Sequence, residues 1–297
     1  MTEPFELPAA TRIGRVRLRV GDLERSLRFY RDLLGFHPVD PGLPPAPAGP
    51  RRVVGLGTRP DAPPLVLLEE VPGARPPGAR TTGLYHYALL FPDRRSLARA
   101  VLRLARAGWP FEGFSDHLVS EAIYLRDPDG NGLELYADRP RSAWRYRGRE
   151  VEMATRPLDL EGLFRELEAE PPPWDGIPAG TVVGHVHLHV SDLGRAQAFY
   201  EGLLGLAVMN RTYPGALFLA AGGYHHHVAV NIWNGVGAPP PPPEAAGLVY
   251  FELLVPGEDA RDALLRRLQE QGVAPEPIPE GLLVRDPDGI GVLIGSG

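Results

Sequence analysis

The stretch "VGDLERSLRFYRDLLGF" (residues 20–36) has a counterpart in the second half of the chain, "VSDLGRAQAFYEGLLGL" (residues 190–206). Further along each half, "LRDPDGNGLELY" (125–136) is matched by "VRDPDGIGVLIG" (284–295). The two pairs of similar stretches occur in the same order in both halves. The chain therefore contains two copies of one unit, and the fold has to be built by repetition.

Each half divides again into two modules that open on a strand and continue into a helix. The opening strands show the alternation of a half-buried strand, and they read "GRVRLRV", "LYHYALLF", "GHVHLHV" and "LVYFELLV". Amphipathic helices are predicted to follow over residues 23–34, 94–107, 193–204 and 258–271. Short strands, with "DPDG" turns in two places, complete the plan. The sequence thus predicts four βαβββ modules, numbered 1 to 4, over residues 12–70, 83–138, 181–235 and 247–295.

The predicted fold class is α+β, with the four modules paired into two cupped, partly open β-barrels and the helices outside. Residues 1–140 form the first half and residues 181–297 the second. A linker over residues 141–180 joins them and carries a short amphipathic helix near 158–168. The "PPPW" that follows this helix is expected to act as a stiff spacer.

Composition excludes several classes of function. The 297 residues carry a net charge of −6 and contain no basic run that would follow a nucleic-acid backbone. No cysteine is present, so a metal site has to use imidazole and carboxylate ligands. The N-terminal residues do not resemble a signal peptide, and no apolar run has membrane-spanning length. We expect a cytoplasmic protein with no nucleic-acid or membrane partner; a homo-oligomer is compatible with the sequence.

Four βαβββ modules in two pairs resemble the vicinal oxygen chelate superfamily, which includes glyoxalase I, drug-sequestering resistance proteins and type I extradiol dioxygenases. The resemblance covers nearly the whole chain and rests on "RFYRDLLGF" and "DPDGNGLELY". The two-copy layout, "GLYHYALL", "SDHLVSEAIYLRDPDGNGLELYADRP" and "GGYHHHVAVNIWNGVGAPPPP" are most similar to the catechol 2,3-dioxygenase-like, ring-cleaving branch.

In this superfamily, one position on the first strand of a module commonly supplies a metal ligand. Seven residues before the end-of-strand Asp or Gly, modules 1 to 4 have Arg15, His86, His185 and Tyr250. The last strand of a module supplies a carboxylate, which "GLELY" offers as Glu134. Two imidazoles and one carboxylate are the ligand set of non-haem Fe(II), and Mn(II) suits the same ligand types. The resemblance therefore implies Fe(II), or alternatively Mn(II), held by His86, Glu134 and His185.

These ligands meet only if module 2 shares a cavity with module 3, and module 1 with module 4. Pairing module 1 with 2 and module 3 with 4 would leave every cavity without two histidines and a carboxylate at these positions. The linker looks like an ordinary domain boundary, which favours the second arrangement, yet about 40 residues can span either. We favour the pairing of modules 2 and 3 because it builds a metal site.

The strand "VVGHVHLHVSD" (182–192) places three histidines at alternate positions. Alternation puts His185, His187 and His189 on the same face, toward the cavity. A His-x-His pair can share one metal ion, so His187 competes with His185 as the ligand. If His185 is the ligand, His187 and His189 are expected to contact substrate.

Module 2 and the end of module 3 offer acid–base groups. By resemblance, Tyr124, ten residues before the carboxylate ligand, hydrogen-bonds a substrate oxygen, and His117 holds the other side of the ring. In "GGYHHHVAVN", alternation predicts that His225, His227 and Asn231 share one face. His227 is the acid–base candidate because imidazole titrates near neutral pH. His225 and Asn231 are then expected to contact substrate, with His225 as the alternative acid–base group.

The sequence favours an extradiol dioxygenase that opens a catechol- or hydroquinone-type ring with O₂. A glyoxalase-type isomerase or lyase is one alternative, although it usually has a second glutamate where module 3 offers Asn231 or a histidine. A non-enzymatic protein that sequesters small molecules such as drugs is the other alternative, although such proteins usually lack metal ligands.

Overall fold

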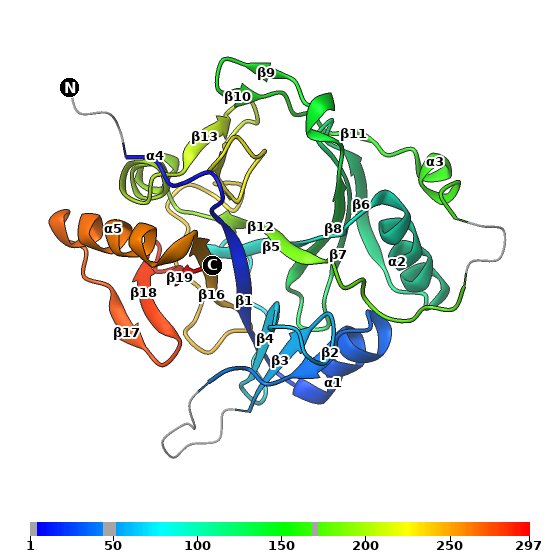
Figure 1. Cartoon of the computed structure of the whole chain (residues 1–297). Coiled ribbons are helices and arrows are strands. Elements are labelled where there is room, and N and C mark those ends of the chain that lie inside the picture. The colour runs from blue at the N-terminus through cyan, green and yellow to red at the C-terminus, as the bar shows by residue number, and fades with distance from the viewer. Residues whose placement is uncertain (1–4, 44–51, 168–171) are drawn as a thin grey trace.

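The computed structural model describes residues 5–43, 52–167 and 172–297, and all four predicted modules are present (Figure 1). Module 1 contains β1 (Arg12–Val20), α1 (Leu23–Leu27), β2 (His37–Val39), β3 (Val53–Gly57) and β4 (Val66–Glu70). Module 2 contains β5 (Gly83–Leu90), α2 (Arg94–Arg106), β6 (Phe111–Asp116), β7 (Ser120–Arg126) and β8 (Gly132–Asp138). Module 3 contains β12 (Val182–His189), α4 (Leu193–Gln197), β13 (Ala207–Asn210), β14 (Ala216–Ala220) and β15 (Val228–Asn231). Module 4 contains β16 (Gly247–Val255), α5 (Gly257–Glu270), β17 (Glu276–Ile278), β18 (Gly281–Arg285) and β19 (Gly291–Ser296).

The helices of modules 1 and 3 begin in the same way. The Asp22 carboxylate accepts the backbone N–H of Arg25 at 2.9 Å, and the Asp192 carboxylate accepts that of Arg195 at 2.7 Å, as N-cap residues do. Each helix then continues as a π-helix, over Arg28–Leu33 after α1 and over Ala198–Leu203 after α4. The repeated sequence of the two halves therefore produces a repeated local structure.

The strands form two large sheets, and each sheet takes one module from each half of the chain. The nine-stranded sheet has the order β11-β6-β7-β8-β5-β12-β15-β14-β13, so it joins module 2 to module 3. The eight-stranded sheet has the order β17-β18-β19-β16-β1-β4-β3-β2, so it joins module 4 to module 1. The prediction that module 2 pairs with module 3 is confirmed. Helices α2, α4 and α5 lie outside the strands (Figure 1).

The segment between the halves follows the surface of this arrangement. It contains a 3₁₀ turn at Arg141–Ala143, the short strands β9 (Tyr146–Arg147), β10 (Glu150–Val151) and β11 (Arg156–Pro157), and α3 (Leu160–Phe164). β11 pairs with β6 and so extends the nine-stranded sheet at its edge. None of the helices in the described part of the chain has both the length and the apolar character needed to cross a membrane.

A buried tyrosine links the modules within each half. The Tyr30 hydroxyl, in module 1, donates to Asp127 Oδ2 at 2.9 Å in the "DPDG" turn of module 2. The Tyr200 hydroxyl, in module 3, makes the same contact with Asp286 of module 4 at 3.0 Å. These tyrosines are fully buried, so the tyrosine repeated in the sequence fixes each helix against the turn of the following module.

Candidate metal centre

Three adjacent strands of the nine-stranded sheet carry the candidate metal ligands. β5 lies between β8, to which it is parallel, and β12, to which it is antiparallel. In this register Ala88 of β5 is opposite Glu134 on one side and His185 on the other. His86 precedes Ala88 by two positions, so it lies on the same face of the sheet. Because Ala88 carries only a methyl group, the side chains of Glu134 and His185 meet across it.

The donor atoms of these side chains converge on one point. His86 Nε2 lies 3.0 Å from Glu134 Oε2, and His185 Nε2 lies 3.2 Å from the same oxygen. Metal–donor bonds of about 2.1 Å at right angles hold donor atoms about 3 Å apart, so this spacing fits one ion. His86 Nε2 is buried, and apart from this contact with Glu134, which lacks hydrogen-bond geometry, it has no polar partner among the described residues. A cation between the three side chains would satisfy this nitrogen.

The protonation states of the group also suit a metal ion. Burial alone would raise the pKa of the Glu134 carboxyl, but the rings of His185 and His86 hold that pKa well below its usual range. Burial lowers the pKa of His185 to about 4, against the opposing effect of Glu134. An ionised carboxylate and a neutral imidazole are the forms that bind metals. A carboxylate that is only 3% exposed is costly without a cation, so the residues fit the expected group.

The hydrogen bonds of Asn231 favour His185 over His187 as the ligand. The backbone N–H of Trp233 donates to Asn231 Oδ1 at 3.0 Å, which fixes the orientation of the amide. His189 Nδ1 donates to the same oxygen at 2.7 Å. Asn231 Nδ2 therefore donates to His187 Nε2, at 2.9 Å. That bond occupies Nε2 of His187, whereas Nε2 of His185 faces Glu134.

Tyr124 and His117 form a hydrogen-bonded pair beside the ligands. Tyr124 of β7 is opposite Glu134 of β8, and its hydroxyl lies 2.7 Å from His117 Nε2. His117 Nδ1 lies 2.8 Å from the carbonyl oxygen of Ala154, which can only accept, so Nδ1 carries the proton. His117 Nε2 then accepts the proton of the Tyr124 hydroxyl. Burial, and next the charge of Glu134, raise the pKa of Tyr124 well above its usual value.

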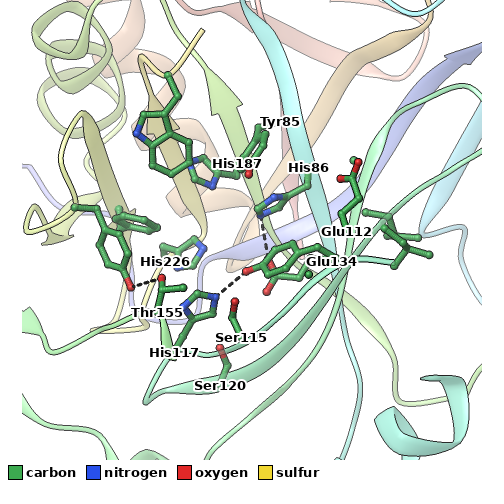
Figure 2. A pocket seen from close by; sticks show the side chains of 18 of the residues that line it. Tyr85, His86, Glu112, Ser115, His117, Ser120, Glu134, Thr155, His187 and His226 are labelled. Atoms are coloured by element: carbon green, nitrogen blue, oxygen red, sulfur yellow. Dashed lines mark hydrogen bonds and ion pairs between the residues drawn. The ribbon is translucent and has the colours of Figure 1, made fainter. Parts of the chain in front are cut away.

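A cavity of about 310 Å³ opens over these groups (Figure 2). Besides His86, Glu134, Tyr124 and His117, its lining includes the rings and apolar side chains Tyr85, Met153, His187, Tyr213, Phe218, His226 and Trp233. Ser115, Ser120 and Thr155 supply hydroxyl groups. Small-molecule sites span roughly 300 to 1,000 Å³, so a cavity of this size suits a compact ligand such as a single aromatic ring.

The Glyoxalase/Bleomycin resistance protein/Dioxygenase superfamily model matches residues 12–135 and 182–294. The chain belongs to this superfamily. It is 43% identical over 283 residues to a Catechol-2,3-dioxygenase of Bacillus subtilis (strain 168), covering 93% of this chain and 94% of that protein. The crystal structure of a protein from Bacillus subtilis subsp. subtilis str. 168 superposes on this chain with a TM-score of 0.66 at 14% identity. The superposition covers 98% of this chain and 86% of that protein. Glyoxalase I from Zea mays has a TM-score of 0.56 at 18% identity, covering 96% and 92%.

These comparisons confirm the resemblance that the sequence motifs indicate. The two solved structures are only 14% and 18% identical to this superfamily member, so their similarity shows a shared fold and carries no statement about function. The match to the Bacillus subtilis enzyme, in contrast, has 43% identity and covers 93% of this chain, so it extends over both halves.

The orientation of the three histidines His225–His227 differs from the one expected from the sequence. β15 begins only at Val228, so the three histidines precede the strand and strand alternation does not orient them. His226 lines the cavity, whereas His225 and His227 do not. His227 Nδ1 instead accepts the backbone N–H of Ala221 at 3.2 Å. The expectation that His227 faces the cavity is wrong, and His226 is the residue that sequence reasoning missed.

His189 and Asn231 also lie away from the cavity. His189, at the end of β12, lines a neighbouring pocket instead, and Asn231 is fully buried and is not among the residues that line the cavity. The geometry therefore does not support the expectation that His189 and Asn231 contact substrate. Both side chains orient His187, which does line the cavity. The available sequence signal was the alternation of β12, which cannot reveal where the cavity ends along the strand.

Proposed function

We propose that this protein is an Fe(II)-dependent extradiol dioxygenase that opens a catechol- or hydroquinone-type ring with O₂, with Mn(II) as the alternative ion. The observation that carries the proposal is the buried group of His86, Glu134 and His185 beneath a cavity of single-ring size. Support comes from the 43% identity with a Catechol-2,3-dioxygenase over nearly the whole chain.

The ion would be held by His86 Nε2, Glu134 and His185 Nε2. When bound, an Fe(II) ion with three protein ligands would supply open positions for both oxygens of a catechol and for O₂, and would pass electron density from the catechol to O₂. The chain itself has to seat the ring, accept a proton from a substrate hydroxyl and return a proton to the product.

The pair of Tyr124 and His117 provides a path for the substrate proton. Because the Tyr124 hydroxyl donates to His117 Nε2, its oxygen keeps lone pairs that can accept a hydrogen bond from substrate. A proton taken up at Tyr124 can pass to His117, whose second N–H is held by the Ala154 carbonyl. The raised pKa of Tyr124 makes it a relay and not a standing anion.

The remaining walls seat the ring and supply a second acid–base group. Phe218 and Trp233 contact the ring of His187, with centroid distances of 5.7 and 5.3 Å, and all three line the cavity. His226 reaches the cavity from the loop before β15 (Figure 2). We therefore assign to His226 the acid–base role that the sequence suggested for His227 and, as the alternative, for His225.

Two other functions account for the site less well. A glyoxalase-type isomerase or lyase usually adds a second carboxylate ligand, but the ligand group around Glu134 contains one carboxylate among the described residues. A protein that only sequesters a small molecule gains nothing from a buried carboxylate facing two imidazoles, which is costly without a cation.

Ring cleavage by the iron-loaded chain tests the proposal. Protein loaded anaerobically with Fe(II) is mixed with catechol or hydroquinone in air-saturated buffer, and O₂ uptake is followed together with the yellow ring-fission product. Glu134→Gln should lose bound iron and activity without unfolding. Glu112→Gln changes another carboxylate of the same cavity and should keep its iron.

Three outcomes would contradict the proposal. Iron binding with full turnover by Glu134→Gln would exclude this ligand set. Turnover of a hemithioacetal with Ni(II) or Zn(II), without ring cleavage, would identify an isomerase. Tight binding of an aromatic ligand that a chelator does not change, with no turnover, would identify a sequestering protein.

A further inference from the structure

A chain of hydrogen bonds leads from the cavity to Asp138, at the end of β8. His226 lines the cavity, His225 follows behind it, and Asp138 is 24% exposed at the outer end. We propose that Asp138 and His225 are positioning residues that set the tautomer of His226, so that the Nε2 lone pair of His226 faces the substrate. This inference rests on the proposed ring-cleaving function and names two residues that the reaction needs although they do not touch substrate.

The order of donors and acceptors follows from Asp138. A carboxylate can only accept, so the His225 Nε2 that lies 3.1 Å from Asp138 Oδ1 carries a proton. An imidazole with a single N–H has its lone pair on the other nitrogen, here Nδ1 of His225. Nδ1 of His226 lies 2.7 Å from that lone pair and therefore donates. The lone pair of His226 is then on Nε2.

Neighbouring groups hold Asp138 in place. Its second oxygen, Oδ2, accepts the hydroxyl of Tyr224 at 2.9 Å. The Tyr224 oxygen in turn lies 2.8 Å from the hydroxyl of Tyr136, so Tyr136 donates to Tyr224. With both of its oxygens engaged, Asp138 has one orientation, and the direction of the chain toward His226 is fixed.

The tautomer decides what His226 can do at the cavity. No described residue makes a hydrogen bond to His226 Nε2, so this nitrogen is available to a ligand. A lone pair there accepts a hydrogen bond from a phenolic hydroxyl of substrate and so orients it. In the other tautomer His226 would present an N–H and could not accept this hydrogen bond. The chemical class selected is an aromatic ring with a free hydroxyl group directed at His226.

The tautomer can be measured without activity. Long-range ¹H–¹⁵N correlation spectra of the full-length, metal-free protein labelled in histidine distinguish rings protonated at Nδ1 from rings protonated at Nε2, and His226→Gln assigns the signal. We expect His226 to carry its proton on Nδ1 and His225 on Nε2. A His226 ring protonated on Nε2 would overturn the inference, whatever the protein catalyses.

Substitution of Asp138 provides the kinetic test. Asp138→Leu leaves the N–H of His225 without an acceptor, which favours the other tautomer of both rings, so kcat should fall about 10- to 100-fold with little change in KM. Asp138→Asn offers both a donor and an acceptor of the same shape, so both tautomers are satisfied and kcat should recover to within a few-fold. The melting temperature and the iron content of each variant are measured alongside.

The outcomes separate this inference from the proposed function. Unchanged kcat in Asp138→Leu, in protein whose wild type opens the ring, would overturn the inference alone. If Asp138→Leu does not fold, His225→Gln is used, and unchanged kcat there has the same meaning. A wild type that cleaves no ring would remove the proposed function, while the tautomer spectra would still decide the hydrogen-bond order.

Discussion

Acid should destabilise the metal-free protein, because His185, His187, His226 and His227 stay neutral when folded. Burial lowers the pKa of His185 to about 4 and that of His227 to about 3, and it lowers the pKa of His187 and His226 well below the usual value. In the unfolded chain the same rings titrate near 6.5. Between pH 7.5 and 5.5 the unfolded state therefore binds protons that the folded state does not, and the free energy of unfolding falls as the pH falls.

The magnitude follows from the unfolded pKa alone. Each of the four rings lowers the free energy of unfolding by about 1.4 kcal/mol between pH 7.5 and 5.5, which makes about 5.6 kcal/mol together. Asp127 and Asp286 act in the opposite direction, since burial raises the pKa of each to about 6. Because the folded state binds protons at these two carboxylates, each raises the free energy of unfolding by about 0.8 kcal/mol over the same pH range. The expected net loss is about 4 kcal/mol, a large part of the 5 to 15 kcal/mol typical of a folded domain.

Urea unfolding in the presence of a chelator, followed by the fluorescence of the four tryptophans, measures this difference. His226→Gln should reduce it by about 1.4 kcal/mol, because one of the four rings is removed. His37→Gln, a change on the partly exposed strand β2, controls for loss of a histidine elsewhere. Equal or greater stability at pH 5.5 would refute the reasoning, since it would mean that the rings bind protons without unfolding.

Four substitutions test other parts of the structure. Ala88→Val fills the space across which two candidate ligands meet, so Fe(II) affinity should fall at least about tenfold in a metal titration, given the close packing of interiors; unchanged affinity would place the ion elsewhere. Tyr124→Phe should lower kcat about 100-fold while iron content stays constant, and a normal kcat would remove Tyr124 from the proton path. Tyr30→Phe and Tyr200→Phe should each lower the free energy of unfolding by about 1 to 3 kcal/mol in urea, because each leaves a buried aspartate without its hydroxyl donor; a neutral result in either would show that the aspartate finds another partner.

The histidine run before β15 shows where prediction from the sequence stopped. The sequence indicated that the three consecutive histidines belong to a site. Their orientation, however, depends on where the strand begins, which is at Val228. Alternation counted from within the strand assigned the cavity to His225 and His227. The backbone before the strand turns differently, and His226 is the residue that lines the cavity. Local periodicity is informative only inside a regular element.

By itself, the sequence determined the four modules, because these depend on an internal repeat and on short-range periodicity. Through its resemblance to a known superfamily it also indicated the candidate ligands His86, Glu134 and His185. The tertiary structure decided that modules 2 and 3 share a sheet, and with it the meeting of these side chains across Ala88. Pairing between strands distant in the chain depends on the packing of both sheets together. No local pattern encodes which of two compatible partners a strand selects.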